Sequence, residues 1–266
     1  MYQFEFKRAE SLDEAAKLLN DGGQLLAGGQ TMLASMKQRL MQPETLVDLQ
    51  GLSDLAGICE DGNALVIGAM TRHQAVATDP MVNSKIPALA HLAGGIGDKQ
   101  VRAMGTLGGS VANNDPAACY PSAVLGLGAT VKTNKREIAA DDFFEGLYAT
   151  ALEPDELITA VRFPVPQMAA YAKFKQPASR YALVGVFVAK TDDGVRVAIT
   201  GAGNGVFRHE GLEAALNADF SADAVENVVI DASDLSGDLH ASSEYRAHLI
   251  KIQTQRAVNQ ALGKES

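Results

Sequence analysis

Two glycine-rich segments carry polar groups that could hold a phosphate. The first reads Leu25-Leu26-Ala27-Gly28-Gly29-Gln30-Thr31-Met32. Its pattern predicts a strand that delivers a glycine pair to the start of a helix, where free backbone amides and the helix dipole favour an anion. An isolated glycine pair is, however, more often a tight turn whose glycines only relieve steric crowding. Taken alone, this segment permits either interpretation.

The second segment combines bare glycine backbone with hydroxyl and amide side chains. It reads Thr106-Leu107-Gly108-Gly109-Ser110-Val111-Ala112-Asn113-Asn114-Asp115-Pro116. Such groups can donate hydrogen bonds to phosphate or ribityl oxygens, although a glycine-kinked strand and turn would have the same composition. A dinucleotide diphosphate needs donors from several directions, so two such segments about 80 residues apart favour a shared cofactor site over two unrelated turns.

Other nucleotide-binding and catalytic motifs are absent from the sequence. It has no Gly-Lys-Ser or Gly-Lys-Thr and no Gly-x-Gly-x-x-Gly, which disfavours a Rossmann unit for nicotinamide. The segment from Gly201 to Gly205 follows an expected strand but is interpreted as a loop. No Gly-x-Ser-x-Gly elbow occurs, and Cys119 is interpreted as a small buried packing residue.

A metal site in this chain is not expected either. Most of the histidines have polar neighbours, and none has metal-ligand spacing; they are His73, His91, His209, His240 and His248. With only Cys59 and Cys119, the chain cannot ligate an iron-sulfur cluster through four thiolates. Any such centre must lie on a partner.

Composition narrows the class of protein. The net charge of −9 is spread over 266 residues, and the nearest basic run, Lys132 to Arg136, is interrupted, which argues against nucleic-acid binding. The first residues have no basic segment followed by an apolar one, and no apolar stretch approaches membrane-spanning length. We therefore expect a cytoplasmic protein without a membrane span.

The elements that must position the first segment form a β-α-β unit over residues 1 to about 55. Ser11 to Glu14 has the spacing of a helix capping box, and Leu25 to Ala27 is a short buried strand. A second helix is predicted over Met32, Leu33, Met36 and Leu40, followed by a strand at Leu46 to Leu49.

The middle of the chain is expected to surround the second segment. Strands are predicted at 65–69 and 157–163, Thr71 is expected to cap a helix running towards Asp79-Pro80, and another helix is expected at 87–93. We place a domain boundary at Pro164-Val165-Pro166. Beyond it, strands at 184–189 and 195–200 joined by Asp192-Asp193-Gly194, with helices at 211–216 and 243–261, predict a small antiparallel sheet with helices.

Short motifs over nearly the whole chain match a known family. The first part contains Ala27-Gly28-Gly29-Gln30-Thr31, Met36-Lys37-Gln38-Arg39-Leu40, Gly97-Asp98-Lys99-Gln100-Val101-Arg102, Thr106-Leu107-Gly108-Gly109-Ser110 and Asp115-Pro116-Ala117-Ala118. The second contains Tyr171-Ala172-Lys173-Phe174-Lys175, Ala182-Leu183-Val184-Gly185-Val186 and His240-Ala241-Ser242-Ser243-Glu244-Tyr245-Arg246. Jointly they resemble the flavoprotein medium subunit of the carbon monoxide dehydrogenase and xanthine dehydrogenase family of molybdenum hydroxylases.

The resemblance implies an α+β fold with two domains. Residues 1–166 would be an FAD-binding domain of the vanillyl-alcohol-oxidase (PCMH) type, with subdomains of about 1–55 and 56–166 clasping non-covalent FAD. Residues 167–266 would be a small α+β C-terminal domain. The diphosphate would lie between the two glycine segments, and the implied FAD-binding residues are Leu25, Leu26, Ala27, Gly28, Gly29, Gln30, Thr31, Met32, Ile96, Thr106, Gly108, Gly109, Ser110, Asn113, Asp115, Ile158 and Lys175.

The sequence departs from the family pattern at one position of this implied site. Members usually have an acidic residue just after Asp-Pro-Ala-Ala, where this chain has Cys119. A hydrogen bond from that position to the sugar or ribityl hydroxyls of the cofactor is therefore in question. Asp115 is expected either to compensate or to cap the turn ahead of Pro116. Lys175 and Arg180 flank a turn at which a cation could meet flavin or phosphate, although such residues are more often solvated.

The resemblance also implies a role in electron transfer. Substrate would be oxidised at a molybdenum-pterin centre on a large subunit. Electrons would cross two iron-sulfur clusters on a small subunit to FAD, which reduces an external acceptor. The assembly would be a dimer of heterotrimers, and this chain would supply no catalytic acid-base pair. Two alternatives stay open, a stand-alone FAD-dependent oxidoreductase on the same flavin fold and a scaffold that has lost its cofactor.

Overall fold

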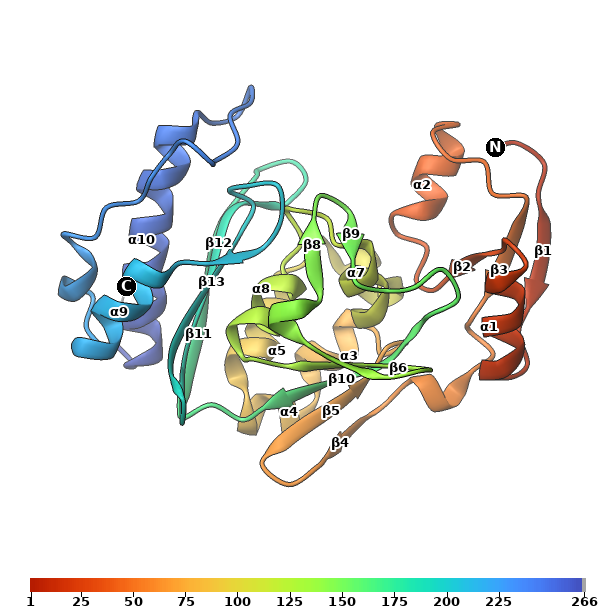
Figure 1. Cartoon of the computed structure of the whole chain (residues 1–266), viewed down its shortest axis with the longest axis horizontal. Coiled ribbons are helices and arrows are strands. Elements are labelled where there is room, and N and C mark those ends of the chain that lie inside the picture. Colours follow the sequence, from red (N-terminus) through yellow and green to blue (C-terminus); the bar gives the residue numbers. More distant parts are fainter. Residues whose placement is uncertain (265–266) are drawn as a thin grey trace.

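The computed structural model describes residues 1–264 and begins with the expected β-α-β unit (Figure 1). Its parallel sheet has the order β1-β3-β2. The unit comprises β1 (Glu5–Arg8), α1 (Leu12–Asn20), β2 (Gln24–Leu26), α2 (Met32–Lys37), β3 (Thr45–Asp48) and the short helix η1 (Ser53–Leu55). Helix α1 begins at the predicted capping box, since Ser11 Oγ accepts from the Glu14 N–H and Glu14 Oε2 accepts from the Glu10 N–H.

Helix α2 is shorter than the periodicity predicted. It ends at Lys37, because Arg39 adopts the left-handed conformation with φ of 62°. The Leu40 N–H then bonds the Ser35 carbonyl, and the Arg39 N–H bonds that of Met36, which is the hydrogen-bond pattern of a Schellman ending. Leu40 lies outside the helix and is 75% exposed, so its assignment to the apolar face was wrong.

An antiparallel sheet forms the centre of the molecule, with the order β4-β5-β10-β6-β7. Its last strand in sequence, β10, pairs with both β5 and β6 and confirms the predicted strand that ends at Pro164. These strands are β4 (Ile58–Glu60), β5 (Ala64–Gly68), β6 (Thr130–Thr133), β7 (Glu137–Ala139) and β10 (Ile158–Pro164). A small hairpin, β8 (Phe144–Gly146) and β9 (Ala149–Thr150), follows the short helix η2 (Ala140–Asp142).

Six helices lie between β5 and β6 in sequence: α3 (His73–Thr78), α4 (Pro80–Lys85), α5 (Pro87–Gly94), α6 (Lys99–Met104), α7 (Leu107–Asn113) and α8 (Tyr120–Gly126). Thr71 does not cap α3 as expected, because its hydroxyl is held between the N–H and the carbonyl of Gly57. The helix does run to Asp79 as expected, since α3 ends at Thr78, and Asp79 also begins the next helix. Its carboxylate accepts from the Met81 and Val82 N–H groups and starts α4.

The C-terminal part is the expected antiparallel sheet with helices. It contains β11 (Met168–Lys175), β12 (Ala182–Thr191), β13 (Gly194–Thr200), β14 (Phe207–Arg208), α9 (Glu210–Ala218), the short helix η3 (Asp223–Val225) and α10 (Ser243–Ala261). The predicted turn at Asp192-Asp193-Gly194 joins β12 to β13, and Gly194 takes a φ of 121° there. The predicted bounds of α10 are confirmed.

Both faces of this sheet are buried, on different sides (Figure 1). Phe187 and Ala198 pack into the central core against α8, whereas Val186 and Val188 belong to a second core on the side of α10. One hydrophobic core therefore continues across Pro164 to Pro166, where the sequence suggested a boundary with few contacts. Among residues 1–264, no helix has the length and hydrophobicity that crossing a membrane requires.

Arg246 fixes α10 to the end of this sheet. Its guanidinium is buried and donates to the carbonyls of Leu183 and Gly201 at 2.8 and 2.6 Å and to the Asp238 carboxylate at 2.7 Å. The guanidinium thus joins three segments, because it carries several N–H donors that point in different directions.

Replacing this residue tests the anchor. Arg246→Met should lower the free energy of unfolding in urea by about 3 kcal/mol, because buried carbonyls lose charged donors. The matched control is Arg256→Met, an exposed position on the same helix, which should change stability by less than about 0.5 kcal/mol. Equal losses in the two variants would contradict the assigned role.

Candidate FAD-binding site

A cavity of about 590 Å³ lies between the first β-α-β unit and the central helices. Its size is typical of small-molecule sites. Sixteen of the seventeen expected binding residues line it, from Leu25 to Met32 on one side to Ile158 on another. The exception is Lys175, at the end of β11, which does not line the cavity. Segments distant in sequence thus converge on one space.

Gly28 brings the two glycine segments together. A Cβ at this position would lie 2.3 Å from the Met104 carbonyl oxygen and 2.7 Å from the Gly105 Cα, so only glycine permits this contact. Gly108 is equally constrained, because its Cβ would lie 2.5 Å from that of Ala69. These glycines therefore set the approach of two backbones as well as the shape of each turn.

The first segment offers unused backbone donors. Gly29 has φ of 68°, and its carbonyl accepts from the Leu33 N–H. Within residues 1–264, the N–H groups of Gln30, Thr31 and Met32 meet no protein acceptor, and all three residues line the cavity. Three neighbouring free amides beside a glycine turn suit a phosphate.

The second segment is a helix start, and neither a kinked strand nor an open loop. Thr106 caps α7, with its Oγ1 accepting from the Gly109 N–H. The Leu107 and Gly108 amides are already bonded to the carbonyls of Thr71 and Ala69. This segment therefore contributes side chains instead of amides, and in the described part of the chain the Ser110 hydroxyl and the Asn113 amide have no protein partner. Such groups suit ribityl and sugar hydroxyls.

Together these features fit FAD. The cavity joins free amides for a diphosphate to hydroxyl and amide side chains, and its remaining wall is largely apolar, as a flavin or adenine ring requires. Among the described residues, no group of three or more metal-ligating side chains is present.

Tyrosines missed by the sequence analysis lie beside Asp115. The Asp115 carboxylate accepts from the Ala117 N–H, which caps the turn as one alternative predicted, and its other oxygen lies 3.4 Å from the Tyr148 hydroxyl. Tyr148 sits at the tip of the β8–β9 hairpin, which Asn114 holds through the Gly146 and Ala149 carbonyls. Burial and Asp115 raise the pKa of both Tyr148 and Tyr181, so both stay protonated at neutral pH.

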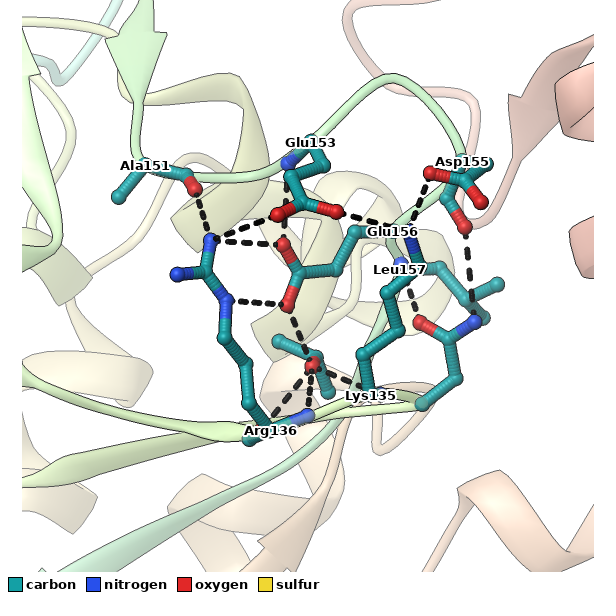
Figure 2. A network of polar contacts seen from close by, with 9 residues as sticks. Lys135, Arg136, Ala151, Glu153, Asp155, Glu156 and Leu157 are labelled. Atoms are coloured by element: carbon teal, nitrogen blue, oxygen red, sulfur yellow. Dashed lines mark hydrogen bonds and ion pairs between the residues drawn. The ribbon is translucent and has the colours of Figure 1, made fainter.

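An ion pair between the exposed Arg136 and the buried Glu156 holds the opposite wall (Figure 2). Arg136 donates twice to Glu156 at 3.0 Å, and Thr133 adds a hydrogen bond of 2.7 Å. These bonds, led by those from Arg136, lower the pKa of Glu156 to about 2. Lys135 also contacts Glu153 and Asp155. The network fixes the segment containing cavity residues Leu152, Pro154, Glu156, Leu157 and Ile158.

His73 is an exception to the expectation that most of the histidines have polar neighbours. It is 5% exposed, lines the cavity, and its Nδ1 has no partner among the described residues. A Cβ on Gly105 would lie 2.6 Å from its Nε2, so the ring supports the glycine that contacts Gly28. Burial, assisted by the charge of Arg102, lowers the pKa of His73 to about 4.

This shift predicts a pH dependence of stability. The folded protein keeps His73 neutral, whereas the unfolded chain protonates it near pH 6.5, so stability falls as the pH drops from 6.5 towards 4. The full contribution is about 3 kcal/mol. We expect His73→Leu to reduce the slope of unfolding free energy over this window. His248→Leu, at an exposed position, should keep the wild-type slope. Parallel curves for wild type and His73→Leu would show that His73 is not responsible.

Comparisons with known proteins agree with this geometry. Residues 2–166 match the family described as "FAD binding domain in molybdopterin dehydrogenase". The carbon monoxide dehydrogenase medium chain of Afipia carboxidovorans is 34% identical, over 97% of this chain and 96% of that protein. The glyceraldehyde dehydrogenase medium chain of Sulfolobus acidocaldarius is also 34% identical, over 96% and 97%.

Solved structures show the same likeness along nearly the full length. Reconstituted CO dehydrogenase from Oligotropha carboxidovorans superimposes with a TM-score of 0.92 at 32% identity, over 99% of each chain. Quinoline 2-oxidoreductase from Pseudomonas putida gives a TM-score of 0.89 at 30% identity, over 98% of each chain. The chain therefore belongs to the family of FAD-binding medium subunits of molybdopterin dehydrogenases, and it is an oxidoreductase component.

Proposed function

We propose that this chain is an electron-transfer subunit, which takes electrons from iron-sulfur clusters on a partner and passes them from FAD to an external acceptor. The main observation behind this proposal is that three free amides of the first glycine segment and the free side chains of the second line the same cavity. FAD supplies the redox chemistry when bound, and the protein supplies orientation and electrostatics.

Each part of the cavity has a proposed task. Gln30, Thr31 and Met32 donate amides to the diphosphate, while Ser110 and Asn113 bind ribityl or sugar hydroxyls. Ile96 and Ile158 pack on rings. Two proposed domains, 1–166 and 167–266, form the body around this site. Lys175 has no proposed contact, since it lies outside the cavity.

The proposed partners are a small iron-sulfur subunit and a large molybdenum-pterin subunit, in a dimer of heterotrimers. Two observations support this. The relatives carry names such as medium chain, medium subunit and subunit beta. The chain has two cysteines, too few for a four-thiolate cluster. Both are free thiols, and Cys59 is exposed, which supports a reducing cytoplasmic location.

The contact at Gly28 can be tested by one added methyl group. Gly28→Ala should weaken FAD binding by at least about tenfold, because the methyl group displaces Met104 and separates the two segments. The control is Gly94→Ala, whose Cβ would meet only Ala77 at 3.8 Å and should leave affinity unchanged. Titration of apoprotein with FAD, followed by flavin fluorescence, measures both. Unchanged affinity in Gly28→Ala, with circular dichroism confirming folding, would contradict the role.

Electron transfer requires the partners. Co-expression with the proteins encoded beside this chain should yield a complex, in which reduced iron-sulfur subunit bleaches the flavin absorbance in a stopped-flow experiment. The isolated chain should be yellow and inert towards organic substrates. Turnover of such a substrate by the isolated chain would favour the stand-alone oxidoreductase. A colourless product from the complete complex would favour a scaffold.

A further inference from the structure

Three cations surround one edge of the cavity and bind neutral oxygen and sulfur atoms. Lys173 Nζ donates to the Gly95 carbonyl at 2.8 Å, to the Arg180 carbonyl at 3.0 Å and to Cys119 Sγ at 3.4 Å. Arg102 donates to the carbonyls of Ile96 and Gly97, and Arg180 donates to that of Gly97. Within residues 1–264, none of the three cations forms an ion pair with a carboxylate.

The carboxylates of the cavity lining do not pair with these cations. Asp115 and Glu156 are its only carboxylates among the described residues. Glu156 is already paired with Arg136, which leaves Asp115 as the lining carboxylate without an ion pair. Arg180 lines the cavity itself, whereas Lys173 and Arg102 lie just behind its lining residues.

Solvent screens Lys173 and Arg102, which are half-buried, less than the exposed Arg180. Of these two, Lys173 is the one that bonds a side chain of the cavity wall. It reaches the cavity through Cys119, which is 5% exposed and lines the wall near Tyr181. Cys119 brings no carboxylate to this position of the cavity wall. The charge of Lys173 consequently acts on the cavity without a compensating carboxylate.

We propose that the uncompensated charge of Lys173, left by Cys119 at the cavity wall, raises the reduction potential of the bound flavin. This inference rests on the proposed function, because it requires FAD in the cavity. Reduction adds electrons to the flavin ring, so a fixed positive charge nearby stabilises the reduced form relative to the oxidised form. Lys173 is thus a residue that acts through its field and touches no reacting atom.

The apolar and aromatic wall around Cys119 favours the flavin ring at this edge over the diphosphate. Lys173 bonds Cys119 and the carbonyls of Gly95 and Arg180. The next residues along the chain, Ile96 and Tyr181, therefore line the cavity at this edge, whereas the free amides belong to the Gln30 to Met32 segment. Charges beside a diphosphate or an adenine would change the affinity for oxidised and reduced FAD equally, which leaves the potential unmoved. The potential therefore distinguishes these arrangements.

The experiment uses the full chain loaded with FAD and titrated against redox dyes of known potential. Cys119→Asp should lower the ratio of reduced to oxidised flavin at fixed potential by at least tenfold, about 30 mV for a two-electron couple. Lys173→Met should shift the ratio in the same direction. Cys119→Ser is the matched neutral control and should leave it unchanged. Affinity for oxidised FAD is measured in parallel.

Each outcome decides the proposal. A lower potential in Cys119→Asp and in Lys173→Met, with the potential of Cys119→Ser unchanged, supports the proposal. If Cys119→Asp cannot retain FAD, the potential of Lys173→Met decides alone. An unchanged potential in variants that retain FAD overturns it. Loss of FAD from both charge variants also overturns it, since Lys173 would then serve binding. Failure of the wild-type chain to take up FAD is a separate result, which refutes the proposed function.

Discussion

The cavity depends on one contact between two backbones, that of Gly28 with Met104 and Gly105. This contact is possible only without a Cβ, and it sets the distance between the first β-α-β unit and the central helices. Beneath it, the buried ring of His73 supports Gly105. Gly28 of the first unit, Gly105 and the neutral ring of His73 in the central part therefore form one continuous series of contacts. Neither glycine position has room for a larger side chain, and the buried position of His73 disfavours a charged group.

Two segments with similar glycine content contribute different chemistry. In the first, a left-handed Gly29 leaves successive amides without protein acceptors. In the second, the amides after Thr106 bond the carbonyls of Thr71 and Ala69, which anchors α7 and leaves only side chains for a ligand. In the first segment glycine leaves backbone donors free for a ligand, and in the second it allows two backbones to pack closely. The family relationship and the cavity agree on FAD, and the division between segments explains how its polar parts are shared.

Sequence reasoning identified elements whose signals are local. The capping box at Ser11, the turn at Gly194 and the bounds of α10 follow from neighbouring residues, and the structure has them. Sequence reasoning failed where the local conformation or the burial of a residue depends on other features of the fold. Leu40 leaves its helix because Arg39 turns left-handed, and Thr71 bonds Gly57 instead of capping α3. Tyr148 reaches the cavity only through a hairpin held by Asn114, and His73 is buried by elements far along the chain. No periodicity within one segment could reveal these positions.

The sheet order has a consequence for how the protein is made. Strand β10 is last in sequence within the central sheet yet lies between β5 and β6, and its first residue, Ile158, lines the cavity. Phe187 of β12 completes the core beneath α8. While the chain is still emerging from the ribosome, both glycine segments are present, but the wall opposite them and its supporting core are not. We therefore expect cofactor loading to follow synthesis of most of the polypeptide.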